Sequence, residues 1–267
     1  MAPVLGPVWL IEIRVLLAGI ALLPLFMRAN LWEIARRKAV PLFVVGVLNS
    51  ALPFLLLAVA SISLPAGFTS ILNATAPLFG TIVAAVWLGE RLTVTRIVGS
   101  ALGFSGVMVL VGWNIVAVTA DVWIAVIAGL FAALMYAIAA PYTKKQLTGV
   151  SPIAIATVSQ FSAALFLLPA LPFTVPQAVP SANIWLAVIA LALFSTSVAY
   201  LLYFYLIQTV GSTKALTVTY LVPVSAMVWG VIALGEPITG SMVFGGGLVL
   251  LGTAIANDLF KGLFVKS

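Results

Sequence analysis

The sequence contains neither cysteine nor histidine among its 267 residues. Their absence removes thiol nucleophiles, imidazole bases, haem ligation and ordinary zinc sites. Charged residues are also scarce, at 7% of the chain, with only six acids. Five of these acids stand in predicted loops or helix ends, so a mechanism based on paired carboxylates has no support. The sequence therefore predicts a protein that is not an enzyme and that holds no metal or cofactor.

Apolar residues make up 64% of the chain, and the mean hydropathy is +1.27. Apolar runs near the ~20 residues that cross a bilayer recur along the whole sequence. These runs are continuous and do not alternate, which favours helices over barrel strands. We predict an all-α membrane protein with nine spans, at residues 6–27, 40–60, 66–88, 96–113, 122–141, 152–172, 184–208, 215–234 and 240–257.

The net charge of +6 could suggest a nucleic-acid partner, but a basic binding face needs clustered lysines and arginines in polar surroundings. Here every basic residue except Arg14 follows the first, third, fifth, seventh or ninth predicted span. This is the positive-inside pattern, and it places those loops and the C-terminus in the cytoplasm. We therefore expect a multi-pass protein of the bacterial cytoplasmic (inner) membrane that contacts the lipid bilayer and no nucleic acid.

Two pairs of segments show that the chain contains an internal repeat. PLFGTIVAAVWLGERLT begins at Pro77 and PVSAMVWGVIALGEPIT at Pro223, while GPVWLIEIRVLLAGIALLPL begins at Gly6 and SPIAIATVSQFSAALFLLPA at Ser151. We assign an N-terminal repeat to residues 1–117 and a C-terminal repeat to residues 118–267. The predicted helix 122–141 has no counterpart before residue 1, so we expect that the first helix of the usual ten is absent.

Restoring that helix would give each repeat five spans, and an odd number makes the second repeat enter the membrane inverted relative to the first. The fold expected is thus two inverted five-helix repeats, the arrangement from which secondary transporters obtain two access states. The chain resembles the EamA-type members of the drug/metabolite transporter superfamily. The resemblance rests on this repeat, on a proline within each fourth helix, on a Gly-Glu pair that closes it and on an arginine in the second helix: Pro77, Pro223, Gly89-Glu90, Gly235-Glu236 and Arg14. It implies a ten-helix carrier that exports small metabolites, with amino-acid exporters among its relatives.

Prolines inside apolar helices indicate where a substrate could bind. A proline leaves the carbonyl of residue i−4 without its donor, and in lipid that oxygen must find another partner or line a cavity. The predicted kinks lie at Pro53, Pro77 and Pro223. The carbonyls that they free belong to Asn49, Asn73 and Thr219, so a polar side chain accompanies each one. The alternative is that these side chains bond a neighbouring helix as packing contacts.

Other candidate substrate ligands lie in the second repeat. Thr196 and Tyr200, followed by Tyr203, share one face of the seventh span. Gln160 lies near the middle of the sixth span, where an unpaired amide would be costly. Tyr220 and Trp229 flank the expected kink of the eighth span, although aromatic residues also serve as packing or interfacial residues.

Glu12 and Arg14 are the charged residues well inside an apolar run, which makes them candidates for coupling or gating. They lie two residues apart, a rotation of roughly 200° on a helix, so they need different partners. Glu12 could carry a proton for antiport. Arg14 could bind substrate, or its long side chain could reach the interface.

Glycines in the fourth and ninth spans form small-residue faces that allow close helix approach, either within the chain or between two copies in a homodimer. They are Gly99, Gly103 and Gly106, and Gly245, Gly246, Gly247 and Gly252.

We predict a secondary transporter that exports small metabolites, with amino acids the favoured substrate, by alternating access. An exporter of drugs or other metabolites is an alternative. A non-transporting receptor or assembly subunit is another, disfavoured by the duplicated kinks. A channel is disfavoured because no filter-like segment or ring-forming charge is present.

Overall fold

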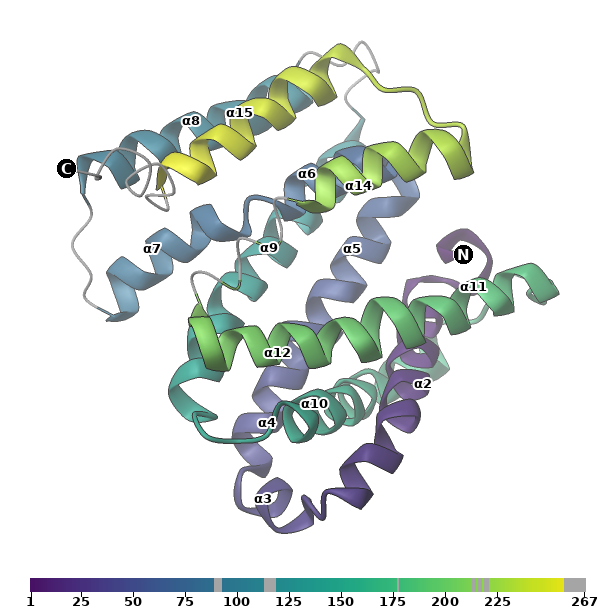
Figure 1. The fold of residues 1–267 in the computed structure, drawn as a ribbon. Helices are drawn as coiled ribbons and strands as arrows, with labels where there is room; N and C mark the ends of the chain where they lie inside the picture. Colours follow the sequence, from purple (N-terminus) through teal and green to yellow (C-terminus); the bar gives the residue numbers. More distant parts are fainter. Residues whose placement is uncertain are drawn as a thin grey trace. The chain divides into compact units, whose positions relative to one another are not determined.

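The computed structural model describes residues 1–88, 93–112, 119–176, 178–212, 215, 218 and 221–256. Over these residues the regular structure is entirely helical (Figure 1). The chain divides into two compact units, each built from two separate stretches of sequence. Unit 1 contains Met1–Ile62 and Ala139–Ala215, and unit 2 contains Ser63–Ile138 and the chain from Leu216 onward.

Seven helical segments in the described residues are long and apolar enough to cross a membrane: residues 7–28, 39–63, 66–87, 94–111, 120–146, 152–173 and 182–210. Two shorter apolar helical segments cover residues 221–234 and 240–256. These segments correspond to the nine predicted spans. The expected fold class, an all-α membrane protein, is confirmed.

Unit 1 is formed by helices from both predicted repeats. Its first stretch contains α1 (Ala2–Leu5), α2 (Pro7–Arg28), α3 (Trp32–Arg37), α4 (Ala39–Gly46), the π-helical segment η1 (Val47–Ala51) and α5 (Leu52–Ser63). Its second stretch contains the end of α9 (Ala120–Gln146), α10 (Pro152–Leu167), the 3-10 segment η2 (Leu168–Phe173), α11 (Ala182–Ala192), the π-helical segment η3 (Leu193–Val198) and α12 (Ala199–Val210).

The helices α2 and α10 begin in the same way and pack against each other. Each has a proline at its first position, Pro7 or Pro152, where the missing N–H costs nothing because the first turn has no acceptor for it. In α10 the Ser151 side chain also accepts a hydrogen bond from the Ile153 backbone N–H. The two segments whose sequences resemble each other are therefore neighbours in unit 1.

The basic loops of unit 1 meet at one end of that unit. Lys38 Nζ donates to the Gln146 carbonyl (3.3 Å), and Lys144 Nζ donates to the Gln208 carbonyl (2.9 Å). Gln208 Nε2 in turn donates to the Leu147 carbonyl (2.8 Å). The loop after α3, the loop after α9 and the end of α12 thus share one side, as the positive-inside pattern requires of loops in the same compartment.

Unit 2 contains α6 (Ala66–Asn73), α7 (Ala76–Leu88), α8 (Val94–Gly112), most of α9, α14 (Leu221–Trp229), the π-helical segment η5 (Gly230–Leu234) and α15 (Gly240–Ala256). Within it the Glu236 carboxylate accepts hydrogen bonds from the Ala66 backbone N–H, at 3.2 Å to Oε1 and 3.0 Å to Oε2. The carboxylate supplies an acceptor for the first turn of α6 and a negative charge at its N-terminus.

The predicted kink at Pro77 is a break between two helices. Helix α6 ends at Asn73, two turn residues follow, and Pro77 is the second residue of α7. In the break, Thr75 Oγ1 donates to the Leu72 carbonyl (2.7 Å) and the Leu78 N–H donates to the Thr75 carbonyl (2.9 Å). A proline in a first helical turn needs no donor, so the chain accommodates it by restarting the helix. Such broken helices are tolerated in membranes where protein surrounds them.

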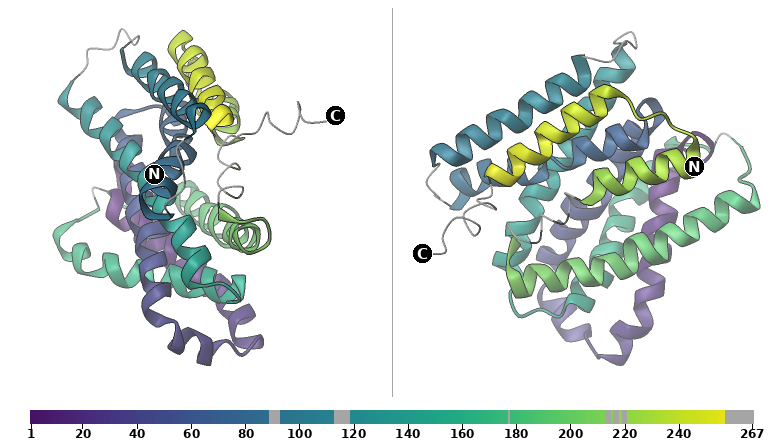
Figure 2. Two further views of the ribbon diagram at one scale, coloured as in Figure 1. Left: turned by 90° about the vertical axis from the view of Figure 1, so that its left-hand side faces the viewer. Right: turned by 45° about the horizontal axis from the view of Figure 1, so that its top comes forward.

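Helices α8 and α15 lie side by side in every view (Figures 1 and 2). A Cβ atom added to Gly106 would lie 2.6 Å from the Gly245 carbonyl oxygen, and one added to Gly245 would lie 2.8 Å from the Gly106 carbonyl oxygen. An added Cβ at Gly99 or Gly103 would likewise meet backbone or side-chain atoms in this unit. The glycine faces are therefore used for packing inside the chain, and a homodimer through them stays a prediction.

The two units do not coincide with the two predicted repeats. Each unit contains residues of both repeats, and the stretch Ser63–Ile138 of unit 2 crosses the predicted boundary. The boundary at residues 117 and 118 stays a prediction about the sequence.

We expect Gly106→Ala to destabilise the protein by about 1–3 kcal/mol, the usual cost of overpacking a tight interface. The measurement is thermal unfolding of the purified protein in detergent. Gly247→Ala on α15 is the matched control, because an added Cβ there meets nothing within 4 Å. Equal melting temperatures for the two variants would contradict this account of the α8–α15 contact.

Candidate functional site

Two π-helical segments of unit 1 carry the polar residues of the candidate site. η1 supplies Asn49 and Ser50 immediately before Pro53, and η3 supplies Thr196 and Ser197. All four residues are buried. π-helical turns are rare and occur frequently at functional sites, because the wider turn exposes carbonyls and re-aims side chains.

The carbonyl freed by Pro53 has a side-chain partner. Pro53 has no N–H to offer the carbonyl of Asn49, four residues earlier. The Tyr200 hydroxyl donates to that oxygen from α12, and the Tyr200 ring lies 5.8 Å from the Phe54 ring, centroid to centroid. The kink thus joins the first stretch of unit 1 to the second through a buried polar contact.

Hydroxyl side chains in η3 bond carbonyls one π-helical turn earlier. Thr196 Oγ1 donates to the Leu191 carbonyl (3.1 Å), and Ser197 Oγ donates to the Ala192 carbonyl (2.9 Å). The Thr196 oxygen then remains able to accept a bond from another helix.

Arg14 on α2 donates the hydrogen bond that Thr196 Oγ1 accepts. Its Nε donates to Thr196 Oγ1 (2.8 Å), and its Nη2 lies 3.4 Å from the Ser195 carbonyl oxygen. The guanidinium carbon lies 3.7 Å from the centroid of the Phe54 ring, a cation–π stack. Arg14 is half-buried, so a positive charge is held between an aromatic face and a π-helical turn inside the bundle.

Gln160 approaches η1 from α10. Its Nε2 lies 3.0 Å from Ser50 Oγ, and both side chains are fully buried. Gly46 allows this approach, because a Cβ there would lie 2.5 Å from the Ser159 carbonyl oxygen. Small residues at such crossings let membrane helices come close enough for side-chain hydrogen bonds.

Several buried polar atoms of unit 1 have no hydrogen-bond partner among the described residues. Asn49 Nδ2, Gln160 Oε1 and the Tyr203 hydroxyl belong to this group, as does Glu12 Oε2. Turning the Gln160 amide over would exchange its two polar atoms and still leave one without a partner. Because an unsatisfied polar group in an apolar interior is costly, these atoms point to a ligand or water as their missing partner.

The structure brings five of the predicted site residues into one network within unit 1, namely Arg14, Asn49, Gln160, Thr196 and Tyr200, together with Pro53. Glu12 is buried on α2, at 2% exposure, without a described bond to that network.

The remaining predicted residues lie elsewhere. Asn73, Pro77, Pro223 and Trp229 belong to unit 2. There Asn73 Oδ1 is a buried atom without a described partner, and the Trp229 side chain is 64% exposed. Thr219 and Tyr220 lie outside the described residues.

Sequence reasoning missed Ser50 and Phe54, which contact Gln160 and Arg14. Both flank the kink at Pro53, so their position next to a proline in an apolar span was the signal available. A metal site does not emerge from the part of the chain that the structure describes, since no three acidic side chains gather there.

A bundle of membrane-spanning helices whose kinked segments surround buried polar atoms has the architecture of a membrane transporter. The chain belongs to the EamA-like transporter family, whose model matches residues 1–112 and 123–257. The resemblance found in the sequence is thereby confirmed, and the protein is a multi-pass membrane protein of a transporter family.

Similar proteins from other organisms are described as transporters. An uncharacterized transporter of Archaeoglobus fulgidus is 28% identical over 80% of this chain and 75% of its own length. A probable terminal-alkyne amino-acid exporter of Streptantibioticus cattleyicolor is 30% identical over 73% of this chain and 65% of its own. The uncharacterized transporter YvbV of Bacillus subtilis is 27% identical over 96% of this chain and 84% of its own.

A solved crystal structure has a similar fold, with a TM-score of 0.70 and 18% identity over 97% of this chain and 89% of that one.

We expect Tyr200→Phe to lower stability by about 1–2 kcal/mol, because it leaves the buried Asn49 carbonyl without this donor. Tyr203→Phe is the matched control on the same helix, since the Tyr203 hydroxyl is buried without a partner among the described residues. Removing that hydroxyl should leave the melting temperature in detergent unchanged or raise it. An unchanged melting temperature in Tyr200→Phe would show that the kink contact does not stabilise the bundle.

Proposed function

We propose that the protein is a secondary transporter that exports small metabolites, with amino acids the favoured substrate, across the bacterial cytoplasmic membrane by alternating access. The observation that carries the proposal is the Arg14 guanidinium, bonded to Thr196 and stacked on Phe54, in a unit that also contains buried amides. Family membership supports transport, and the similarity to a probable amino-acid exporter supports the substrate class.

Arg14 suits recognition of a substrate carboxylate. A guanidinium presents five N–H donors in a planar fork that matches a carboxylate and keeps its charge at any physiological pH. The stack on Phe54 and the bond to Thr196 fix the plane of the fork before substrate arrives. Pre-ordering of this kind reduces the entropy lost on binding.

The amides of Asn49 and Gln160 suit the remaining polar groups of an amino acid. Each is buried in η1 or α10 and has one polar atom without a described partner. Carbonyl oxygens accept from an ammonium group, and amide nitrogens donate to a carboxylate or a side-chain oxygen. A zwitterion could thereby satisfy atoms that lipid and protein leave unsatisfied.

An exporter of aromatic drugs or other aromatic metabolites is the second candidate. The Tyr200 ring lies 5.4 Å from the Phe204 ring and 6.4 Å from the Tyr203 ring, centroid to centroid. This cluster offers contact area to a flat apolar ligand. The two candidates differ in whether the ligand needs a carboxylate.

Counterflow of radiolabelled amino acids into proteoliposomes tests the proposal. We expect saturable exchange by the natural protein and about a tenfold or greater loss in Arg14→Gln, because a charge-assisted hydrogen bond is worth about 1.5–3 kcal/mol. Arg37→Gln is the control, because it removes the same charge at a site away from the network. Arg37 is exposed and pairs with Glu33 on the surface of α3.

Three results would contradict parts of the proposal. An unchanged rate of amino-acid exchange in Arg14→Gln would exclude a role for the Arg14 charge in substrate binding. Equal exchange of an amino acid and of the amine without its carboxylate would favour the second candidate. Specific binding of amino acids without flux would indicate a receptor or assembly subunit.

Glu12 is proposed as the group that couples export to the proton gradient, because it is a buried acid within an apolar helix. We expect Glu12→Gln to abolish the stimulation of transport by an imposed pH gradient while counterflow without a gradient persists. Stimulation of equal size in the variant and the natural protein would remove Glu12 from coupling.

A further inference from the structure

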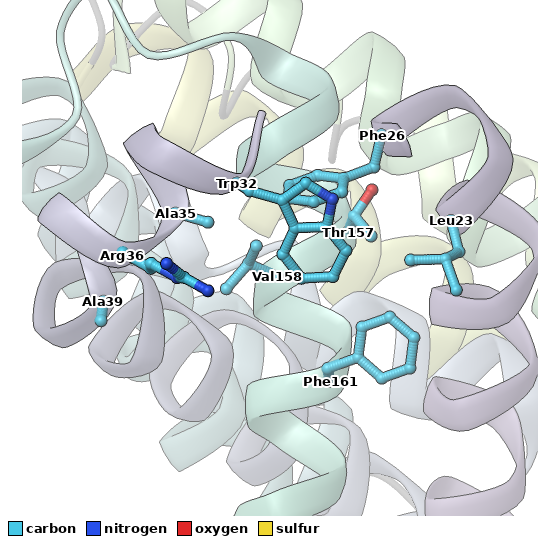
Figure 3. Close-up of a pocket in the computed structure, with 9 residues that line it drawn as sticks. All are labelled: Leu23, Phe26, Trp32, Ala35, Arg36, Ala39, Thr157, Val158 and Phe161. Atoms are coloured by element: carbon cyan, nitrogen blue, oxygen red, sulfur yellow. The ribbon is translucent and has the colours of Figure 1, made fainter. Parts of the chain in front are cut away.

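A pocket lies in unit 1 at the end where the basic loops meet. Its volume is about 420 Å³, within the range of about 300–1,000 Å³ that is usual for small-molecule sites. The pocket lies between α2, α3 and α10 (Figure 3), and its lining consists of Leu23, Phe26, Trp32, Ala35, Arg36, Ala39, Thr157, Val158 and Phe161. None of the network residues around Arg14 contributes to it.

Most of the pocket wall is apolar, with one cation beside it. The Phe26 and Trp32 rings meet edge to face at 5.1 Å between centroids, and Phe161 lines the pocket from α10. The Arg36 side chain extends toward Val158 at one side of the pocket (Figure 3). A ligand that fills this site must combine an apolar body with an anionic group.

Arg36 and its neighbour Arg37 differ in their partners. Arg37 Nη2 lies 2.5 Å from Glu33 Oε1, one helical turn away on α3. Arg36 has no ion pair or hydrogen bond within the described part of the chain, and it lines the pocket whereas Arg37 does not. On this short helix, Glu33 therefore neutralises the charge of Arg37, whereas the charge of Arg36 can bind a ligand in the pocket.

Thr157 gives an independent indication that the pocket holds a ligand. Some buried helical threonines of this chain bond a carbonyl of the preceding turn, as Thr253 Oγ1 does with the Val249 carbonyl at 2.6 Å, whereas the hydroxyls of Thr69, Thr143 and Thr157 have no described partner. Thr157 is 1% exposed and lines the pocket, yet its hydroxyl has no partner among the described residues. A polar atom so deeply buried in a membrane helix calls for a partner, which a ligand in the pocket would supply.

We propose that this pocket binds an anionic phospholipid of the cytoplasmic leaflet. The phosphate binds the Arg36 guanidinium, one acyl chain packs against Leu23, Phe26 and Phe161, and an oxygen of the glycerol ester region accepts a hydrogen bond from Thr157. Charge complementarity supports this occupant. The positive-inside pattern predicts that this end of unit 1 faces the anionic cytoplasmic leaflet, and guanidinium groups bind phosphate in a planar fork. A small soluble anion would leave the apolar walls without a contact.

Lipid retention measured by native mass spectrometry tests the proposal. The purified full chain is exchanged into micelles that contain phosphatidylglycerol and phosphatidylcholine with identical acyl chains, in equal amounts. We expect the natural protein and Arg37→Gln to retain phosphatidylglycerol selectively. Arg36→Gln should weaken that retention about tenfold, the effect of one charge-assisted bond.

Ala35→Phe keeps every charge and adds a ring inside the pocket, so it separates pocket occupancy from surface attraction. We expect it to reduce phosphatidylglycerol retention as strongly as Arg36→Gln does, with amino-acid counterflow as the readout of folding. Equal reductions in Arg36→Gln and Arg37→Gln, or full retention in Ala35→Phe, would overturn the proposal. Displacement of the lipid by millimolar glycerol phosphate would also overturn it, because the site would then recognise a soluble anion.

Discussion

Hydrocarbon supplies no hydrogen-bond partners, and this constraint determines where the polar groups of unit 1 lie. Pro53 withdraws a donor from the Asn49 carbonyl, and the Tyr200 hydroxyl replaces it. The π-helical turn η3 directs Thr196 toward Arg14. The Arg14 guanidinium, a cation inside an apolar bundle, therefore stacks on the Phe54 ring and donates a hydrogen bond to the Thr196 hydroxyl. After these contacts, Asn49 Nδ2 and Gln160 Oε1 stay without a described partner in the same unit.

The network depends on both halves of the sequence. Arg14, Asn49 and Phe54 come from the first predicted repeat, whereas Gln160, Thr196 and Tyr200 come from the second. The resembling helices α2 and α10 pack together, and the close approach of α4 to α10 at Gly46 brings η1 within reach of Gln160. One repeat alone would leave Arg14 without Thr196 and the Asn49 carbonyl without Tyr200.

Hydropathy was sufficient to predict the nine helical segments, because a bilayer fixes both their length and their apolar character. Proline chemistry predicted that the Asn49 carbonyl needs a new partner. Glycine spacing predicted close helix approach, within the chain or between two copies, but not that α8 would contact α15. The π-helical turns, the helix break before Pro77 and the stack of Arg14 on Phe54 could not be predicted, because they depend on which helices become neighbours. The unpartnered Thr157 hydroxyl has no signature in the sequence, since threonine usually bonds its own helix.

The central claim is that a substrate carboxylate binds the guanidinium of Arg14 inside unit 1. The most direct measurement is an experimentally determined structure of the protein in lipid nanodiscs with a transported amino acid bound. The account predicts ligand density with the carboxylate against Arg14, between Phe54 and Thr196, and with the amino group near Asn49 or Gln160. Ligand density at another place, with the Arg14 contacts to Thr196 and Phe54 unaltered and no carboxylate beside them, would contradict it.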